Sequence, residues 1–584
     1  MERLWHIQPQ DSARVQSLER VAGIPSVVAQ LLVARGVYDA DTAKMFLEPK
    51  LSELRDPELL PGVPEAADLI HAAVADNRRI IIYGDYDADG MTSTAILYRC
   101  LQLISANVGY YVPNRMDEGY GLNCAAIEKL ASTGAEMIIS VDCGITSVAE
   151  AAKAKELGVQ MIITDHHELA DELPPAAAIV HPRLPDHNYP FDGLCGAGVA
   201  FKLAWAICQR ASNAKKVSPA LRSYLLSAIG LAAIGTVADV VPLIDENRII
   251  VRHGLKSLLA HPLPGLEQLM ELTGIRKKSE LGSEDIGFVL GPRLNAAGRL
   301  GQAQLGVELL TTDSPDRAKS LAEYIHELNN SRASLERSIY LAANKQVKEE
   351  FDPEGDPALV LSGRGWHKGV IGIVAGRLAE KYHRPVVMIS LDELGSSPGT
   401  GSARSVGGVN LHEALYACTE NLVTFGGHAA AAGLRIDEPH IEQFRANFCD
   451  QIAERFAPEE RVAELRIDTE APLNSMTLRT VSQIESLSPF GQSNPRPMFC
   501  ASGVELAEPP KTMGKGDKHI TVSLQQNGVK FRGVAFNRAE WLDDLSKADQ
   551  PIDVAYRPII NEFRGRRTVE LHIADWKKPA LAPA

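Results

Sequence analysis

The sequence of 584 residues lacks the marks of secreted, disulfide-bonded and membrane-spanning proteins. Its eight cysteines form no C-x-x-C pair and no compact framework, which predicts a reduced intracellular protein. The N-terminus has no basic-then-apolar signal pattern, and no uninterrupted apolar run is long enough to span a bilayer. We therefore expect a cytoplasmic protein without a membrane partner.

Two phosphate-binding fingerprints, the Walker A motif and G-x-G-x-x-G, are missing where one would be expected. A net charge of −14 argues against a broad basic surface for nucleic acid. This sum says little about a single groove, however, because an acidic metal site would itself contribute several negative charges. A nucleic-acid partner therefore stays open.

The length predicts three or four domains, and changes of pattern divide the chain. Short β-rich runs alternate with helix-like stretches between about 75 and 185, which predicts a parallel sheet with crossover helices. A helical pattern without Gly or Pro runs from Ser314 to about Phe351 and suggests a spacer helix between two lobes. A second α/β pattern follows it, and short alternating strands after about 465 fit an oligonucleotide-binding (OB) barrel. The predicted domains are an N-terminal segment packing on the catalytic domain (1–70), the catalytic domain (71–312), the connecting helix (313–351), a smaller α/β domain (352–460) and the barrel (461–584).

Acidic residues and histidines follow three of the predicted strands. The runs 80–83, 137–141 and 161–164 lead into Asp85-Tyr86-Asp87-Ala88-Asp89, into Asp142, and into Asp165-His166-His167. Ligands of open α/β sheets bind beyond the carboxyl ends of the strands, where these side chains would lie. Carboxylates and imidazole without thiolates suit Mn²⁺ or Mg²⁺ rather than structural zinc. Asp239, at the end of an apolar helix that begins at Ser218-Pro219, is a fourth candidate ligand.

Each of these motifs taken alone has a structural alternative. The D-x-D-x-D-G run is equally well a solvated acidic turn, and Asp142 or Asp239 alone is more often a helix cap. An EF-hand is excluded, because no Glu lies six residues after Gly90. Taken together, the residues predict two divalent ions that stabilise an in-line displacement at phosphorus, and hence hydrolysis of a phosphoric ester or anhydride.

The order of these motifs resembles a known family. Asp-Tyr-Asp-Ala-Asp-Gly, Val-Asp-Cys-Gly, Asp-His-His and the Gly-Thr-Val-Ala-Asp stretch around Asp239 resemble the four motifs of the DHH phosphoesterase superfamily. Gly426-Gly427-His428 resembles the associated DHHA1 domain. With the long helix and the barrel, nearly the whole chain is similar to the bacterial single-stranded-DNA-specific exonucleases of this superfamily. The resemblance implies an α/β fold, in which a parallel-sheet DHH domain is joined by a long helix to a smaller α/β DHHA1 domain, followed by an OB-fold barrel.

The resemblance also implies the roles of the residues at the metal site. Asp87, Asp89, Asp142, His166 and Asp239 match metal ligands, with Asp142 between the two ions and Asp85 as a further ligand or a supporting residue. His167 would face the scissile phosphate and stabilise charge. The resemblance implies that water activated by two Mn²⁺ or Mg²⁺ ions, rather than a protein side chain, attacks the phosphorus.

Residues outside the metal site are matched to the substrate in the same way. Arg299, after an apparent glycine turn, and Ser402 and Arg404, in a glycine-flanked turn, resemble a pocket for a 5′-terminal phosphate. Arg115 and Tyr120 resemble a channel mouth that holds a backbone phosphate and stacks a base, and His428 would also contact substrate. Basic residues of the barrel would attract the strand, unless they are scattered surface charges: Lys511, Lys515, Lys518, Arg564, Arg566 and Arg567.

The expected activity is metal-dependent 5′→3′ degradation of single-stranded DNA to nucleoside 5′-monophosphates in repair and recombination. A monomer working with a helicase and a single-strand-binding protein is expected. One alternative is a DHH enzyme for pyrophosphate, short RNA or cyclic dinucleotides, which would not need the barrel. The other is a non-enzymatic DNA-binding scaffold, which would have lost metal ligands.

Overall fold

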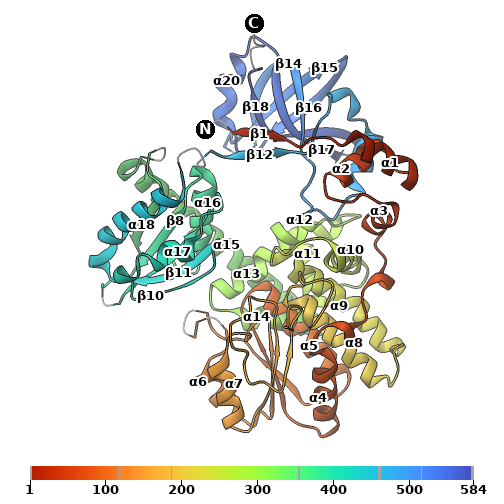
Figure 1. The fold of residues 1–584 in the computed structure, drawn as a ribbon, viewed down its shortest axis with the longest axis vertical. Coiled ribbons are helices and arrows are strands. Elements are labelled where there is room, and N and C mark those ends of the chain that lie inside the picture. Colours follow the sequence, from red (N-terminus) through yellow and green to blue (C-terminus); the bar gives the residue numbers. More distant parts are fainter. Residues whose placement is uncertain are drawn as a thin grey trace.

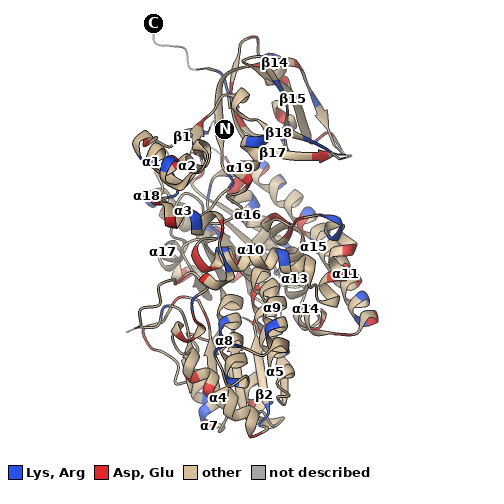
Figure 2. Ribbon diagram, turned by 90° about the vertical axis from the view of Figure 1, so that its right-hand side faces the viewer, with Lys and Arg blue, Asp and Glu red and all other residues tan. Residues whose placement is uncertain are grey.

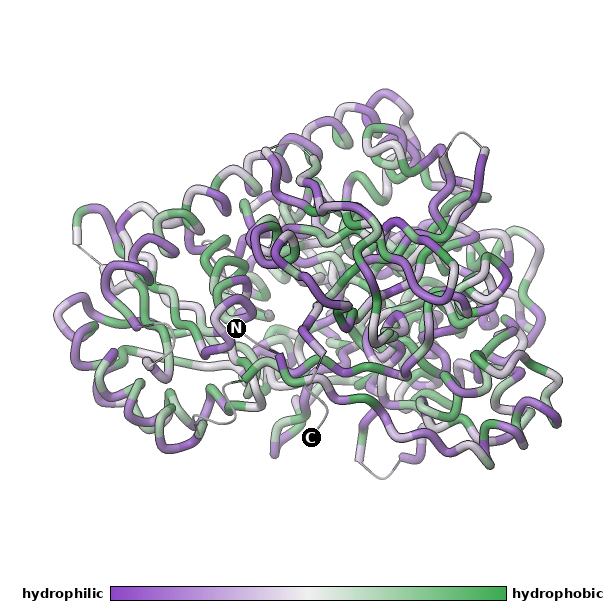
Figure 3. The backbone as a smooth tube through the Cα atoms, turned by 90° about the horizontal axis from the view of Figure 1, so that it is seen from above, coloured by the Kyte–Doolittle hydropathy of each residue, from purple (hydrophilic) through white to green (hydrophobic). Residues whose placement is uncertain are grey.

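The computed structural model describes residues 3–579 except 116, 117, 120, 186, 353, 354, 396, 458–461, 515 and 564, and its chain forms three lobes (Figure 1). We call residues 63–311 the first lobe, 355–457 the second lobe and 464–579 the barrel lobe. In Figure 3 apolar residues gather inside the lobes and hydrophilic residues on the outer loops. In Figure 2 acidic and basic residues are interspersed along the helices.

The first lobe contains a five-stranded, fully parallel sheet in the order β3-β2-β4-β5-β6. Alternate strand residues enter two different cores, for example Ile82 and Ile139 on one face and Ile81 and Ile138 on the other. Both faces are covered, as a parallel sheet requires. The elements of this part are α4 (Val63–Ala75), β2 (Ile80–Gly84), α5 (Ala88–Leu103), β3 (Val108–Tyr111), α6 (Cys124–Ser132), β4 (Met137–Val141), α7 (Val148–Glu156), β5 (Gln160–Thr164) and β6 (Ala178–Val180).

A helical half follows the sheet and packs on its α5 side. Helix α9 is long and apolar enough to cross a membrane, contrary to the expectation from sequence, but it packs as a core helix against α5, α8 and α10. The helices are α8 (Gly196–Ala211), α9 (Pro219–Ala238), α10 (Asp245–Ala260), α11 (Pro264–Thr273), α12 (Ser283–Asp285), the π-helical turn η4 (Ile286–Leu290), α13 (Gly291–Arg299) and α14 (Ala303–Thr311).

The predicted spacer helix is α15 (Pro315–Glu350), which connects the first two lobes. It begins as the capping pattern predicts, because the Ser314 side chain accepts a hydrogen bond from the Arg317 N–H. The second lobe has a mixed sheet in the order β10-β11-β9-β8-β7. Its elements are β7 (Leu359–Arg364), α16 (Ile371–Tyr382), β8 (Val386–Leu391), β9 (Gly399–Arg404), α17 (Leu411–Tyr416), β10 (Thr424–Gly427), β11 (Ala431–Ile436) and α18 (Ile441–Arg455).

The barrel lobe is a closed five-stranded barrel, as predicted. Its strands pair in the circle β14-β15-β16-β18-β17, and the β14–β17 pairing closes it. Closure removes exposed sheet edges. The elements are β12 (Glu464–Ile467), β13 (Thr469–Glu470), α19 (Leu478–Glu485), β14 (Phe499–Met513), β15 (His519–Gln526), β16 (Val529–Ala535), α20 (Leu542–Ser546), β17 (Ile552–Phe563) and β18 (Arg566–Lys577).

The expectation that the N-terminal segment packs on the catalytic domain was wrong for its first half. Strand β1 (Leu4–Ile7) pairs in parallel with β12, and α1 (Ser12–Ala22), α2 (Ser26–Val33) and α3 (Ala40–Leu47) contribute residues to the barrel core. The apolar faces of these helices therefore complete the barrel lobe. Contacts with the first lobe include Arg248, whose buried guanidinium donates to the carbonyls of Phe46 and Ser488.

Candidate two-metal centre and anion pocket

The first acidic motif changes conformation within five residues. Asp85 directly follows β2, and it is buried with its Oδ1 unbonded among the described residues. The segment then turns into α5 instead of staying extended, because Asp87 caps the helix and accepts from the N–H groups of Asp89 and Gly90 at 2.8 and 3.0 Å. The carboxylates of Asp85, Asp87 and Asp89 therefore do not point to one side, as they would in an extended segment.

Asp89 lies in the first turn of α5 and is held by a second helix. Its Oδ2 accepts from Gly196 N at 2.7 Å and its Oδ1 from Ala197 N at 2.9 Å, at the N-terminus of α8. The N-terminal dipole of α8 favours a negative charge there. These two donors were not predicted from the sequence, although the glycine-rich start of an apolar helix at Gly196 indicates them.

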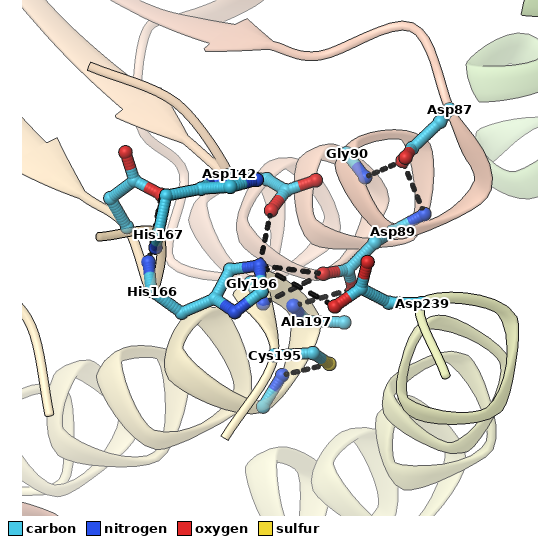
Figure 4. Close-up of polar contacts among 12 residues, drawn as sticks. Asp87, Asp89, Gly90, Asp142, His166, His167, Cys195, Gly196, Ala197 and Asp239 are labelled. Atoms are coloured by element: carbon cyan, nitrogen blue, oxygen red, sulfur yellow. Dashed lines mark hydrogen bonds and ion pairs between the residues drawn. The ribbon is translucent and has the colours of Figure 1, made fainter. Parts of the chain in front are cut away.

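Asp142 and the Asp-His-His turn follow the next two strands of the sheet. Asp142, directly after β4, has a φ of 62° and is buried. The Nε2 atom of the His166 ring faces the carboxylates of Asp142, Asp89 and Asp239 (Figure 4). The distances from His166 Nε2 to these oxygens are 3.2 Å for Asp142, 3.5 Å for Asp239 and 3.8 Å for Asp89.

Seven predicted residues thus meet at one edge of the sheet. Their ligand atoms form three overlapping groups, each within 4.8 Å: Asp85, Asp87 and Asp142; Asp142, His166 and His167; Asp89, His166 and Asp239. Asp142 and His166 each belong to two groups. Asp239, the C-cap of α9, joins the cluster from the helical half of the lobe.

Burial and mutual repulsion set the protonation of the cluster. Burial, together with the charges of Asp89 and Asp87, raises the pKa of Asp239 to about 8 and moves the pKa of Asp142 well above its usual value. Burial lowers the pKa of His166 to about 4, so its imidazole is neutral and suited to metal ligation. Burial also lowers the pKa of His167, but Asp165 outweighs it. The Nδ1 of His167 lies 2.7 Å from Asp165 Oδ1, and this hydrogen bond and the charge of Asp165 raise the pKa of His167 to about 9.

The donor set fits hard divalent ions. Three buried atoms lack a hydrogen bond among the described residues: Asp85 Oδ1, Asp142 Oδ1 and His166 Nε2. The last two lie 3.2 Å apart, but their geometry is not that of a hydrogen bond. Buried polar atoms without partners are rare and costly, and an ion between them removes the cost. Two glycines keep the space open, because a Cβ on Gly196 would lie 2.6 Å from Asp142 Oδ1 and one on Gly235 2.3 Å from Asp89 Oδ1.

Binding of Mn²⁺ to the metal-free protein is expected to release protons at pH 7 and to tighten as pH rises towards 8. Carboxyl groups with raised pKa values hold protons that a metal ion must displace. The same groups should make the metal-free protein less stable as pH rises from about 4 to about 8, because the folded state then binds more protons than the unfolded state. Titration calorimetry in two buffers of different ionisation enthalpy checks the release, and identical heats in both buffers would contradict it.

A cationic pocket adjoins the cluster. Helix α13 ends at Arg299 and is fixed to the metal loop, because Asn295 Oδ1 accepts from Ala88 N at 2.8 Å. The Arg115 guanidinium lies 4.8 Å from the ring centroid of Tyr86 in the same loop. From the second lobe, Arg404 donates to Ser402 Oγ at 3.0 Å.

None of the three arginines of this pocket, Arg115, Arg299 and Arg404, forms an ion pair with a carboxylate of the described residues. Burial and the neighbouring charges of Arg115 and Arg404 lower the pKa of Arg299 to about 10, a value at which it remains charged at pH 7. A Cβ on Gly372, in the first turn of α16, would meet Ser402 Oγ at 2.8 Å and Arg404 Nη2 at 2.9 Å. The pocket therefore combines uncompensated positive charge with a helix N-terminus, which suits an anion.

The local conformations of this pocket differ from those predicted. Ser402 and Arg404 lie on strand β9, not in a turn, and Arg299 ends a helix rather than following a glycine turn. His428 is exposed, and its Nδ1 lies 3.5 Å from Glu168, the residue after the Asp-His-His motif. Tyr120 lies outside the described residues.

A cavity of about 1630 Å³ lies between the barrel lobe on one side and α10 and residues 278–285, which include α12, on the other. Among the basic barrel residues predicted to attract a strand, Arg567 lines it, whereas Lys511, Lys518 and Arg566 do not, and Lys515 and Arg564 are outside the described part of the chain. Burial and the charge of Arg496 lower the pKa of Arg557 there. The basic residues that line the cavity are Arg3, Arg252, Lys256, Lys278, Arg496, Arg538, Arg557 and Arg567.

Each of the three lobes matches a different family model. The DHH family N-terminal domain matches residues 79–229, the DHHA1 domain residues 355–454 and the RecJ OB domain residues 467–575. The single-stranded-DNA-specific exonuclease RecJ of Bacillus subtilis is 37% identical over 98% of this chain and 70% of its own length. The enzyme of the same name from Escherichia coli is 34% identical over 94% of this chain and 96% of its own.

Solved structures agree with these sequence matches. The crystal structure of RecJ in complex with Mn²⁺ from Thermus thermophilus aligns with a TM-score of 0.83 at 31% identity, covering 99% of this chain and 80% of that one. The Mg²⁺ complex from the same organism has a TM-score of 0.76 at 29% identity, covering 99% and 79%. From the identity over nearly its full length and the order of its three domains, the chain belongs to the RecJ family of DHH phosphoesterases.

Proposed function

We propose that the chain is a metal-dependent exonuclease that degrades single-stranded DNA from the 5′ end and releases nucleoside 5′-monophosphates. Metal-dependent exonuclease activity on single-stranded DNA follows from membership of the RecJ family and from the donor set of the acidic cluster. The observation that carries the direction is the cationic pocket beside this cluster, because uncompensated guanidinium groups suit the extra charge of a terminal phosphate.

The residues of the cluster have different roles in hydrolysis. Two divalent ions, when bound, make water more acidic and stabilise the charge that develops on the phosphoryl oxygens. Asp85, Asp87, Asp89, Asp142, His166 and Asp239 would hold them; Asp142 and His166 each belong to two ligand groups, and of these two only the carboxylate of Asp142 offers two oxygen atoms. His167 remains an imidazolium at pH 7, so it neutralises charge at the scissile phosphate.

The anion pocket fixes which phosphodiester is cut. If Arg299, Ser402 and Arg404 hold the 5′-terminal phosphate, the next phosphate along the strand reaches the metal cluster. Water then attacks that phosphorus and the 3′ oxygen of the first nucleotide leaves with a proton. The released nucleotide keeps its 5′-phosphate, and the shortened strand carries a new one that can enter the pocket.

The rest of the strand needs a path, and we assign it to the cavity between the barrel lobe and α10 with residues 278–285. Eight basic side chains line it against five acidic ones, Glu280, Glu284, Asp285, Glu485 and Glu562, so its net charge is positive although the protein is acidic. Its volume exceeds what one small ligand fills. A small diffusible substrate would leave this cavity unused, which favours a polynucleotide over the cyclic dinucleotide alternative.

An end-labelling experiment tests direction and substrate together. Single strands labelled at the 5′ or the 3′ end, and a blunt duplex, are incubated with the protein and Mn²⁺ or Mg²⁺. Release of a labelled mononucleotide at the earliest times from the 5′-labelled single strand alone is the expected result. Earlier release from the 3′ end, or equal digestion of the duplex, would contradict the proposal.

The substrate also limits the cellular setting that we propose. Chromosomal DNA exposes a single strand with a 5′ end only after unwinding or breakage, so we propose a role in repair and recombination beside a helicase and a single-strand-binding protein. A monomer in the cytoplasm suffices, because one chain supplies both the metal ligands and the anion pocket.

A further inference from the structure

A fourth strand of the first lobe ends beside the Asp-His-His turn of the metal cluster. Strand β6 lies beside β5 at the edge of the sheet and runs directly into His181, Pro182 and Arg183. Chemistry-bearing residues follow β2, β4 and β5 in the same way, but β6 has no part in the ligand groups. Its two polar side chains contact the Asp-His-His turn instead.

These contacts complete the hydrogen bonding of both histidine peptides. The N–H groups of His166 and His167 donate to Asp165 Oδ1 at 2.7 and 3.2 Å. The carbonyl of His167 accepts from His181 Nε2 at 2.8 Å, and the carbonyl of His166 accepts from Arg183 Nη2. Side chains therefore hold all four backbone polar groups of the two residues, where the regular strand pairing of β5 has ended.

The environment fixes which ring nitrogen of His181 carries the proton. Its Nδ1 accepts from Arg183 N at 3.0 Å, so its proton lies on Nε2, which points at the His167 carbonyl. The ring is fully buried under the Pro61-Gly62 turn, where His181 N donates to Pro61 O. Gly62 has a φ of 79°, and a Cβ there would lie 1.8 Å from the Ile179 carbonyl, so the turn lies directly against β6.

We propose that His181 and Arg183 are positioning residues that fix the Asp-His-His turn for metal binding. They act through the backbone carbonyls of His166 and His167 and touch neither metal nor substrate. Hydrogen bonds that orient ligands from behind typically change metal affinity or activity about 10- to 100-fold when removed. This inference rests on the proposed role of His166 as a metal ligand.

The test measures Mn²⁺ affinity of the metal-free protein by titration calorimetry, in the absence of DNA. Arg183→Ala removes an exposed side chain, so the fold is expected to survive, and His181→Ala removes the buried ring. Each variant is expected to bind Mn²⁺ about tenfold more weakly and to lower kcat, with the KM for a single strand unchanged. His181→Gln should recover part of the affinity, because its amide N–H reaches towards the same carbonyl. The exposed His187 of the same loop provides the control, and His187→Ala should bind Mn²⁺ like the parent protein.

The outcomes separate this inference from the metal assignment itself. His166→Ala serves as the reference. Unchanged Mn²⁺ affinity in that variant would overturn the role of His166 as a metal ligand, and with it the present proposal. Weak binding by His166→Ala combined with parental Mn²⁺ affinity and kcat in Arg183→Ala and His181→Ala would overturn the positioning role. A purely structural role predicts a lower melting temperature without a change in Mn²⁺ affinity, and thermal melts in chelator measure this. If His181→Ala does not fold, Arg183→Ala decides.

Discussion

Asp142→Asn is expected to lower kcat on single-stranded DNA by about a thousandfold or more while leaving strand binding nearly intact. The metal centre is worth several kcal/mol to a phosphoryl-transfer transition state, and each factor of ten corresponds to about 1.4 kcal/mol. Asp142 is the carboxylate shared between two ligand groups, so its loss weakens both metal positions. The anion pocket and the cavity that we assign to the strand contain no atom of Asp142.

Asparagine is the better substitution at this position. The φ of Asp142 is 62°, in the left-handed region that Asn tolerates, whereas Ala there adds backbone strain to the loss of the carboxylate. Asp142→Ala is expected to be equally inactive. Asp171→Asn, which removes the same charge from an exposed position of the same lobe, is the matched control. Single-turnover digestion and fluorescence anisotropy with a labelled strand give the two readouts, and nuclease activity within tenfold of the parent protein would contradict the metal assignment.

Much of the metal site was predictable because its signal is local. A run of β-branched and apolar residues followed by Asp or His identifies both the strand and its carboxyl end, and parallel strands bring such ends together. The same signal was present at β6, where Ala178-Ile179-Val180 precedes His181. A strand of three residues followed by a histidine outside any recognised motif gives too weak a pattern to predict a role.

The anion pocket was less predictable because it depends on distant segments. Glycines around Ser402 and Arg404 indicated a turn, but pairing of β9 with both β8 and β11 makes that segment a strand. Pairing partners far along the chain override local propensity. The predicted packing of the N-terminal segment was wrong for the same reason. Strand β1 pairs with β12, for example Leu4 with Glu464, and no local pattern reveals this contact.

The overall charge of the chain misleads about its partner for a related reason. The buried acidic cluster and the basic cavity lie on different elements of one protein, and their charges partly cancel in the sum. The potential that a strand meets depends on the groove that it enters, not on the total. A net charge of −14 therefore coexists with a cavity in which basic residues outnumber acidic ones.

Arg299→Ala is expected to lower kcat/KM on a 5′-phosphorylated strand by about 100-fold and on a 5′-hydroxyl strand much less. A hydrogen bond to a charged group contributes about 1.5–3 kcal/mol, and the partly buried Arg299 guanidinium, which forms no ion pair with a carboxylate of the described residues, is available to the phosphate. Arg404→Ala should have a similar effect, because Arg404 lies against Ser402 and the N-terminus of α16. In both variants the preference for a 5′-phosphate should nearly disappear.

The comparison of two substrates makes this prediction specific to the pocket. General damage to the enzyme would slow both strands equally, whereas loss of a phosphate contact slows only the phosphorylated one. Arg435→Ala removes an exposed arginine from β11, the neighbour of β9 in the same sheet, and should leave the preference unchanged. A retained preference in Arg299→Ala and Arg404→Ala would mean that the terminal phosphate binds elsewhere, and the 5′→3′ direction would then need another structural origin.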